Sequence, residues 1–181
     1  MNHEEVSESV PVWLLDVDGV LNVGRPGWDT PPHQGSARHG DREFRMRWAP
    51  SLIVALARLH HDRRVEFRWA TTWVDEISGI ENLMRLPVFP VAFSGLPSSP
   101  QTKTPGLKTE AALNVVEQER RPLIWTDDDA IPTHGALRER LDRSGQPMLL
   151  IAPDPHQGLQ PADLASVQGF LDHLRRDTSV P

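Results

Sequence analysis

The stretch "PVWLLDVDGVLN", residues 11–22, places two aspartates one residue apart directly after a run of apolar side chains. A short apolar run bounded by turn residues is typical of a strand that is buried on both faces of a parallel sheet. Asp16 and Asp18 would then follow the carboxyl end of that strand, where ligands bind in open α/β sheets. The two carboxylates are either a solvated turn or a pair of reactive groups gathered around a metal ion, and the remaining sequence has to decide.

Further apolar runs alternate with segments of helical periodicity along the chain. The sequence predicts strands at residues 65–71, 86–93, 122–127 and 147–152, and helices at residues 49–62, 75–84, 106–119 and 161–176. This alternation predicts a three-layer α/β/α, Rossmann-like fold around a mostly parallel five-stranded sheet. The run at residues 86–93 contains Pro90, which favours an edge position for that strand.

The segment from residue 22 to residue 48 interrupts this alternation. It is rich in Gly, Pro and Arg, and it ends in "REFRMRW", in which Arg45 and Arg47 alternate with apolar side chains. A period of two indicates a strand, so we expect a hairpin-like flap inserted after the first strand. The chain is then a single domain, with a core over residues 10–155, a C-terminal helix over residues 156–176, and tails at residues 1–9 and 177–181.

Composition narrows the functional classes. The chain has 181 residues, a formal net charge of −6 and no cysteine, which argues against a general nucleic-acid binder and excludes disulfides, thiol catalysis and thiolate-bound metals. The N-terminus is polar and acidic, and no apolar run approaches the roughly 20 residues that span a bilayer. We therefore expect a cytoplasmic protein without a membrane partner.

Reactive side chains follow the other predicted strands as well. Thr71 and Thr72 end the strand in "WATTW", Asp127 and Asp128 end the strand in "LIWTDDD", and Lys108 begins the helix that precedes this last strand. Carboxylates crowded at one sheet edge repel one another unless a cation offsets their charge. Oxygen ligands of this kind favour Mg²⁺, and a hydroxyl and an ammonium group beside them suit a phosphoryl group.

These motifs together resemble the haloacid dehalogenase-like (HAD) phosphohydrolases. The family's four motifs correspond here to "DVDGV", "RWATTW", a lysine upstream of the last motif, and "WTDDD", in the family's order over roughly residues 11–155. The chain also resembles a subgroup of small members without a large cap domain. Some relatives in that subgroup are phosphatase-like modules of nucleic-acid repair proteins.

The resemblance implies roles for the catalytic residues. Asp16 would attack phosphorus and form an aspartyl-phosphate intermediate, and Asp18 would protonate the leaving oxygen and later activate the hydrolytic water. Thr71 would hydrogen-bond the phosphoryl oxygens, and Lys108 would neutralise charge on Asp16 and on the phosphate.

The resemblance also implies the ligands of the metal ion. Mg²⁺ would be held by the carboxylate of Asp16, the backbone carbonyl of Asp18, and the carboxylates of Asp127 and Asp128. Asp129 is expected next to the site or in solvent.

Several assignments have alternatives. Thr72 competes with Thr71 for the hydroxyl role, and Lys103, the only other lysine in the chain, competes with Lys108. Trp73 either stacks on a base or sugar of the substrate or packs beneath a loop.

Arg45 and Arg47 also have two interpretations, because they either contact an anionic substrate or form a solvated strand face.

The sequence as a whole predicts a Mg²⁺-dependent phosphohydrolase that acts on a small phosphate ester, a nucleotide or a phosphorylated nucleic-acid end. The alternatives are a non-catalytic module and a signalling receiver, although receivers place their lysine after the acidic cluster. The substrate, the pathway and the oligomeric state stay open.

Overall fold

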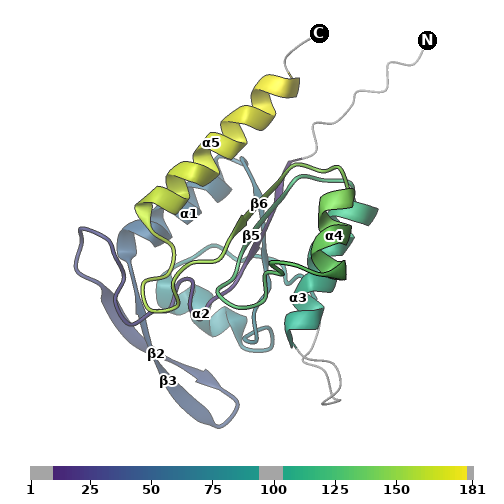
Figure 1. The fold of residues 1–181 in the computed structure, drawn as a ribbon. Coiled ribbons are helices and arrows are strands. Elements are labelled where there is room, and N and C mark those ends of the chain that lie inside the picture. Colours follow the sequence, from purple (N-terminus) through teal and green to yellow (C-terminus); the bar gives the residue numbers. More distant parts are fainter. Residues whose placement is uncertain (1–9, 94–103, 179–181) are drawn as a thin grey trace.

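Four short parallel strands form the central sheet in the computed structural model, which describes residues 10–93 and 104–178 (Figure 1). Their order across the sheet is β4, β1, β5, β6. The strands are β1 (Val12–Leu15), β4 (Glu66–Trp69), β5 (Leu123–Thr126) and β6 (Met148–Ile151). Each lies inside an apolar run, so the predicted α/β class and the parallel sheet are confirmed.

The prediction of a fifth strand at residues 86–93 is wrong. Val91 forms only an isolated parallel bridge with Trp69, made by the Trp69 N–H to the Pro90 carbonyl at 2.8 Å and by the Ala92 N–H to the Trp69 carbonyl at 2.8 Å. Pro87 and Pro90 have no N–H to donate, so the hydrogen-bond ladder cannot extend along this segment. The segment runs beside β4 as an irregular loop.

Helices cover both faces of the sheet (Figure 1). On one face lie α1 (Pro50–His61), α2 (Ile77–Met84) and α5 (Pro161–Thr178), and on the other lie α3 (Thr104–Leu113) and α4 (Ala136–Arg143). The helix predicted at residues 106–119 is α3 followed by a π-helical turn, Asn114–Gln118. Among the described residues, no helix has both the length and the hydropathy needed to cross a membrane.

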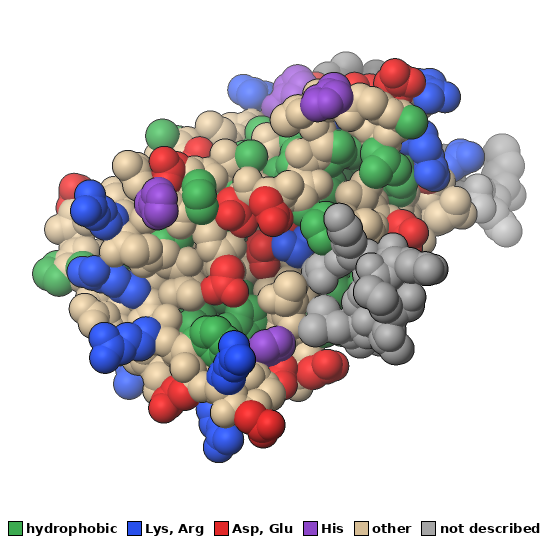
Figure 2. Space-filling model, turned by 60° about the horizontal axis from the view of Figure 1, so that its bottom comes forward, with side chains coloured by type: hydrophobic (Ala, Val, Ile, Leu, Met, Phe, Trp, Pro, Cys, Tyr) green, Lys and Arg blue, Asp and Glu red, His purple; other side chains and the backbone are tan. Residues whose placement is uncertain are grey.

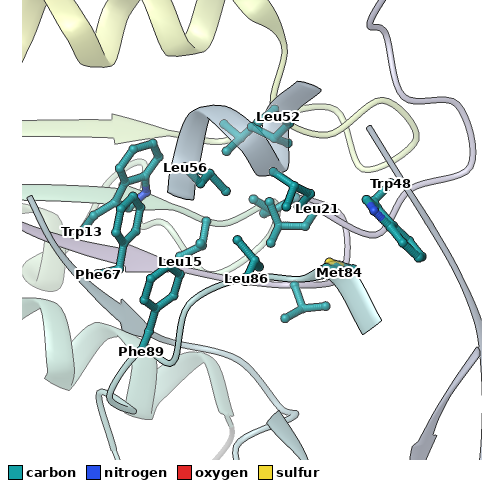
Figure 3. Close-up of a cluster of buried hydrophobic side chains, with 14 of the residues drawn as sticks. Trp13, Leu15, Leu21, Trp48, Leu52, Leu56, Phe67, Met84, Leu86 and Phe89 are labelled. Atoms are coloured by element: carbon teal, nitrogen blue, oxygen red, sulfur yellow. The ribbon is translucent and has the colours of Figure 1, made fainter. Parts of the chain in front are cut away.

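Two hydrophobic clusters pack against the two faces of β1. Trp13 and Leu15 point into the cluster under α1 and α5, whereas Val12 and Leu14 point into the cluster under α3. Figure 3 shows the first cluster, in which Trp13 stacks on Phe67 with ring centroids 5.0 Å apart. Because both faces are covered, the strand has no polar alternation, and its carboxyl end is held firmly in place.

The predicted flap is an antiparallel hairpin inserted after β1. It consists of β2 (His33–His39) and β3 (Arg42–Trp48). Ala37, Met46 and Trp48 are buried in the first cluster, so one face of the hairpin belongs to the core. The hairpin is therefore anchored to the domain rather than detached from it.

Helix α1 offers a direct test of this packing. Leu56 is fully buried in the first cluster, whereas Val54 on the same helix is 68% exposed. Leu56→Ala should lower the free energy of unfolding by about 2–5 kcal/mol, because it leaves a cavity in the core. Val54→Ala should change it by less than about 0.5 kcal/mol. Urea denaturation measures both, and equal losses would contradict the assigned buried face.

Candidate functional site

The chain turns back tightly after β1. The Asp16 carboxyl group is buried and its Oδ1 accepts the backbone N–H of Val17 at 2.7 Å. The N–H groups of Leu21 and Asn22 both donate to the Val17 carbonyl at 2.8 Å, which closes the turn. This turn leaves Asp16 in the interior and brings Asp18 to the surface.

A buried lysine joins two of the buried carboxylates. The Nζ atom of Lys108, on α3, lies 2.5 Å from Asp16 Oδ2 and 2.8 Å from Asp127 Oδ2. All three side chains are at least nine-tenths buried. Buried charges require partners of opposite charge, so these three side chains stabilise one another in the interior.

The two oxygens of Asp127 have different surroundings. Oδ1 accepts the backbone N–H groups of Asp129 at 3.2 Å and Ala130 at 2.8 Å, and so orders the loop after β5. Within the described part of the chain, Oδ2 forms the ion pair with Lys108 but no well-aligned hydrogen bond. This oxygen therefore has coordination capacity left for a cation.

Asp128 completes an acidic group. A Cβ atom added to Gly19 would lie 2.3 Å from Asp128 Cγ, so the Asp128 carboxyl group lies directly on the glycine of the first loop. Gly19 has a φ of +71°, which also favours glycine. Carboxylate oxygens of Asp16, Asp127 and Asp128 lie within 4.8 Å of one another. Figure 2 shows acidic side chains gathered near the middle of the face that it displays. The group of Asp16, Asp127 and Asp128 could hold a metal ion.

The electrostatics of the site reflect this crowding. Burial raises the pKa of Asp16 to about 7, and the negative charge of Asp127 adds to the effect, while Lys108 and a hydrogen bond from Thr71 oppose it. Burial alone would lower the pKa of Lys108, but Asp16 and Asp127 outweigh it and raise this pKa. Burial and the charge of Asp127 also raise the pKa of Asp128. The carboxylates therefore resist full ionisation unless a further cation is present.

The structure brings one of the two threonines to Asp16. Thr71 is fully buried, and its hydroxyl lies near enough to the Asp16 carboxylate to lower the pKa of that group. Thr72 is half-buried in the same turn. The competing lysine, Lys103, lies outside the described residues, whereas Lys108 occupies the centre of the site.

Two hydrogen bonds to Asp18 were missed by reasoning from the sequence. Asn22 Nδ2 donates to Asp18 Oδ1 at 2.7 Å, and Trp73 Nε1 donates to Asp18 Oδ2 at 2.8 Å. Asn22 ends the stretch that opened the sequence analysis, but nothing in its spacing singles it out. Trp73 is only 3% exposed, so its ring offers little surface on which a base could stack.

Arg45 and Arg47 lie on the exposed face of β3 and not in the acidic group. Arg47 is tied to the base of the hairpin, because its Nη1 donates to the Gly24 carbonyl at 3.0 Å and its backbone N–H donates to Asn22 Oδ1 at 2.9 Å.

No model of a known protein family, no curated protein and no solved structure matches this chain. Its function therefore has to be argued from the site itself. That site is a buried group of three aspartates at the carboxyl edge of a parallel sheet, with a lysine between two of them and a threonine beside one.

Removing the lysine should destabilise the fold. In Lys108→Met a side chain of similar length leaves Asp16 and Asp127 buried without their cation, so the free energy of unfolding should fall by about 3–5 kcal/mol. Urea denaturation with EDTA at pH 7 measures the loss. Arg58→Met also removes one positive charge, from a side chain that is 82% exposed, and is the control. Adding Asp16→Asn to Lys108→Met should recover part of the loss, and no recovery would contradict the ion cluster.

The raised pKa of Asp16 predicts how stability depends on pH. Between about pH 4 and pH 7 the folded metal-free protein keeps a proton on Asp16 that the unfolded chain releases, so this group's contribution to stability falls as the pH rises. Asp16→Asn cannot titrate and should lack this part of the decline. Urea unfolding in EDTA from pH 4.5 to 7.5 compares the two proteins. Parallel curves would show that Asp16 does not titrate in this range.

Proposed function

We propose that this chain is a Mg²⁺-dependent phosphohydrolase of the HAD kind, which cleaves phosphate monoesters through an aspartyl-phosphate on Asp16. The observation that carries the proposal is the contact of Lys108 Nζ with both Asp16 and Asp127, beside Asp128. The segments that resemble the four family motifs meet at one edge of the sheet. In a turn that was only solvated, water would hydrate the carboxylates, and no lysine would need to be buried between them.

The donor set suits a hard divalent cation. Its members are all carboxylate oxygens, and Asp127 Oδ2 forms no well-aligned hydrogen bond within the described residues. Asp16, Asp127 and Asp128 would hold Mg²⁺, which prefers oxygen ligands and binds with few carboxylates. When bound, the ion neutralises charge on the carboxylates and on the oxygens of an incoming phosphoryl group.

Asp16 is suited to nucleophilic attack because its orientation is fixed. The Val17 N–H holds Oδ1 and Lys108 holds Oδ2. In the first step an Asp16 oxygen forms a bond to phosphorus and the bond from phosphorus to the ester oxygen breaks. Lys108 favours the ionised carboxylate that this attack requires, and the Thr71 hydroxyl beside Asp16 would turn from that carboxylate to the phosphoryl oxygens.

Asp18 is suited to proton transfer because it lies at the surface of the same turn. In the first step it donates a proton to the departing ester oxygen, which takes the electron pair of the broken bond. In the second step it accepts a proton from the water that attacks phosphorus, and the bond from phosphorus to the Asp16 oxygen breaks. Inorganic phosphate then leaves and both carboxyl groups return to their starting states.

The substrate class follows less directly from the site. The hairpin is a small insertion, and a phosphate ester on either a small molecule or the end of a nucleic acid fits the proposed chemistry. The exposed arginines of β3, Arg45 and Arg47, favour an anionic group beyond the phosphate. We therefore propose a small phosphate ester, a nucleotide or a phosphorylated nucleic-acid end as the substrate.

Hydrolysis of p-nitrophenyl phosphate with Mg²⁺ tests the proposal. Asp16→Asn should reduce kcat/KM by about 10³-fold or more, because it removes the covalent route. EDTA should abolish turnover and added Mg²⁺ should restore it. Asp142→Asn is the matched control, since its exposed side chain pairs with Arg138 on the same helix and does not belong to the acidic group.

Wild-type turnover in Asp16→Asn would refute the mechanism. If no ester in a panel that includes 5′- and 3′-phosphorylated oligonucleotides is cleaved, the non-catalytic module is favoured. A long-lived phosphoryl group on Asp16 after incubation with acetyl phosphate, seen by mass spectrometry without turnover, would indicate the signalling module.

A further inference from the structure

Both oxygens of the Asp18 carboxylate are held by side chains. Asn22 Nδ2 lies 2.7 Å from Oδ1 and Trp73 Nε1 lies 2.8 Å from Oδ2. An exposed carboxylate ordinarily rotates freely, because water replaces any one partner at little cost. Here two neutral N–H donors from different segments fix the plane of an exposed carboxyl group.

The hairpin in turn fixes Trp73. The indole ring packs against His39 at 4.9 Å and against Phe44 at 5.7 Å between ring centroids. Glu76 holds the hairpin tip, because its Oε1 accepts the Gly40 N–H at 3.0 Å and its Oε2 lies 3.0 Å from His39 Nδ1. The chain of contacts therefore runs from the hairpin through Trp73 to Asp18.

We propose that Trp73 is a positioning residue, which orients Asp18 for proton transfer, and that the hairpin β2–β3 sets the position of Trp73. This inference rests on the proposed phosphohydrolase function. Proton transfer requires the carboxyl group to lie within hydrogen-bond reach of the ester oxygen, and a displacement of about 1 Å in an active site can reduce the rate by about 10²-fold. The indole N–H holds Oδ2 while leaving the carboxyl group accessible at the surface.

The alternative is that Asp18 only satisfies a buried indole, which needs a partner for its N–H. The two roles of Trp73 predict different losses of activity for substrates with different leaving groups. A poor leaving group such as an alkoxide needs the proton from Asp18, whereas p-nitrophenolate leaves with little protonation. A merely structural role of Trp73 would affect both kinds of substrate by the same factor.

The experiment compares Trp73→Phe with the wild-type enzyme on two substrates in Mg²⁺. For β-glycerophosphate, kcat/KM should fall by about 10-fold to 100-fold, and for p-nitrophenyl phosphate by less than about 3-fold. The ratio kcat/KM reports only the steps through phosphoryl transfer to Asp16, so the later hydrolysis does not obscure the comparison. Equal losses on the two substrates would overturn the inference.

Trp69→Phe is the matched control. Trp69 is also buried, and its indole N–H donates at 2.8 Å to a carboxylate, Glu81 Oε1, rather than to Asp18. The substitution removes the same kind of buried hydrogen bond. It should leave the ratio of the two kcat/KM values unchanged, and a change like that of Trp73→Phe would overturn the inference.

A second measurement covers the case in which Trp73→Phe does not fold. The indole N–H signals of ¹⁵N-labelled wild-type protein are compared with those of the Asp18→Asn variant. The substitution replaces the charged acceptor of the Trp73 indole N–H, so the Trp73 signal should shift while the Trp69 signal stays in place. An unmoved Trp73 signal would overturn the contact. A wild-type enzyme without any turnover would refute the proposed function as well, whereas turnover with equal losses would refute only the role of Trp73.

Discussion

The buried ion cluster of Lys108, Asp16 and Asp127 is the constraint on which the rest of the site depends. The lysine comes from α3 and the two carboxylates from β1 and β5, and each would be strongly unfavourable in the interior by itself. Folding therefore has to bring all three together, and it does so over a separation of 92 residues between Lys108 and Asp16. With Asp128 nearby, three carboxyl groups share one ammonium group, an arrangement that could hold a further cation.

The sheet supplies the geometry that this cluster requires. β1 lies between β4 and β5 in a parallel ladder, so the carboxyl ends of three adjacent strands lead to Thr71, Asp16 and Asp127 at one edge. Hydrophobic clusters cover both faces of β1, and close packing leaves the strands little freedom to move. The side chains of the candidate site are thus positioned by the apolar residues of the core.

Much of this arrangement could be predicted from the sequence, because apolar runs and period-two alternation are local signals. The strand predicted at residues 86–93 was wrong, because its apolar content favours a strand whereas its prolines cannot donate the hydrogen bonds that a strand ladder needs. Helix α4 was missed because it is mostly charged and buries only Leu141. The placement of Asp16 and Asp127 follows from their positions after strands. The contacts of Asp18 do not, because Trp73 reaches it through side-chain geometry that no spacing rule describes.

Two aspartates one residue apart, Asp16 and Asp18, lie in different environments. Asp16 is buried, its pKa is raised to about 7, and its partner is a cation. Asp18 is exposed, and its partners are neutral N–H donors. In the proposed mechanism the buried carboxyl group is held in place for attack on phosphorus, and the exposed one is accessible for proton transfer. The tight turn at Val17 produces this separation, since it directs one carboxyl group inward and the next outward within a single bend of the chain.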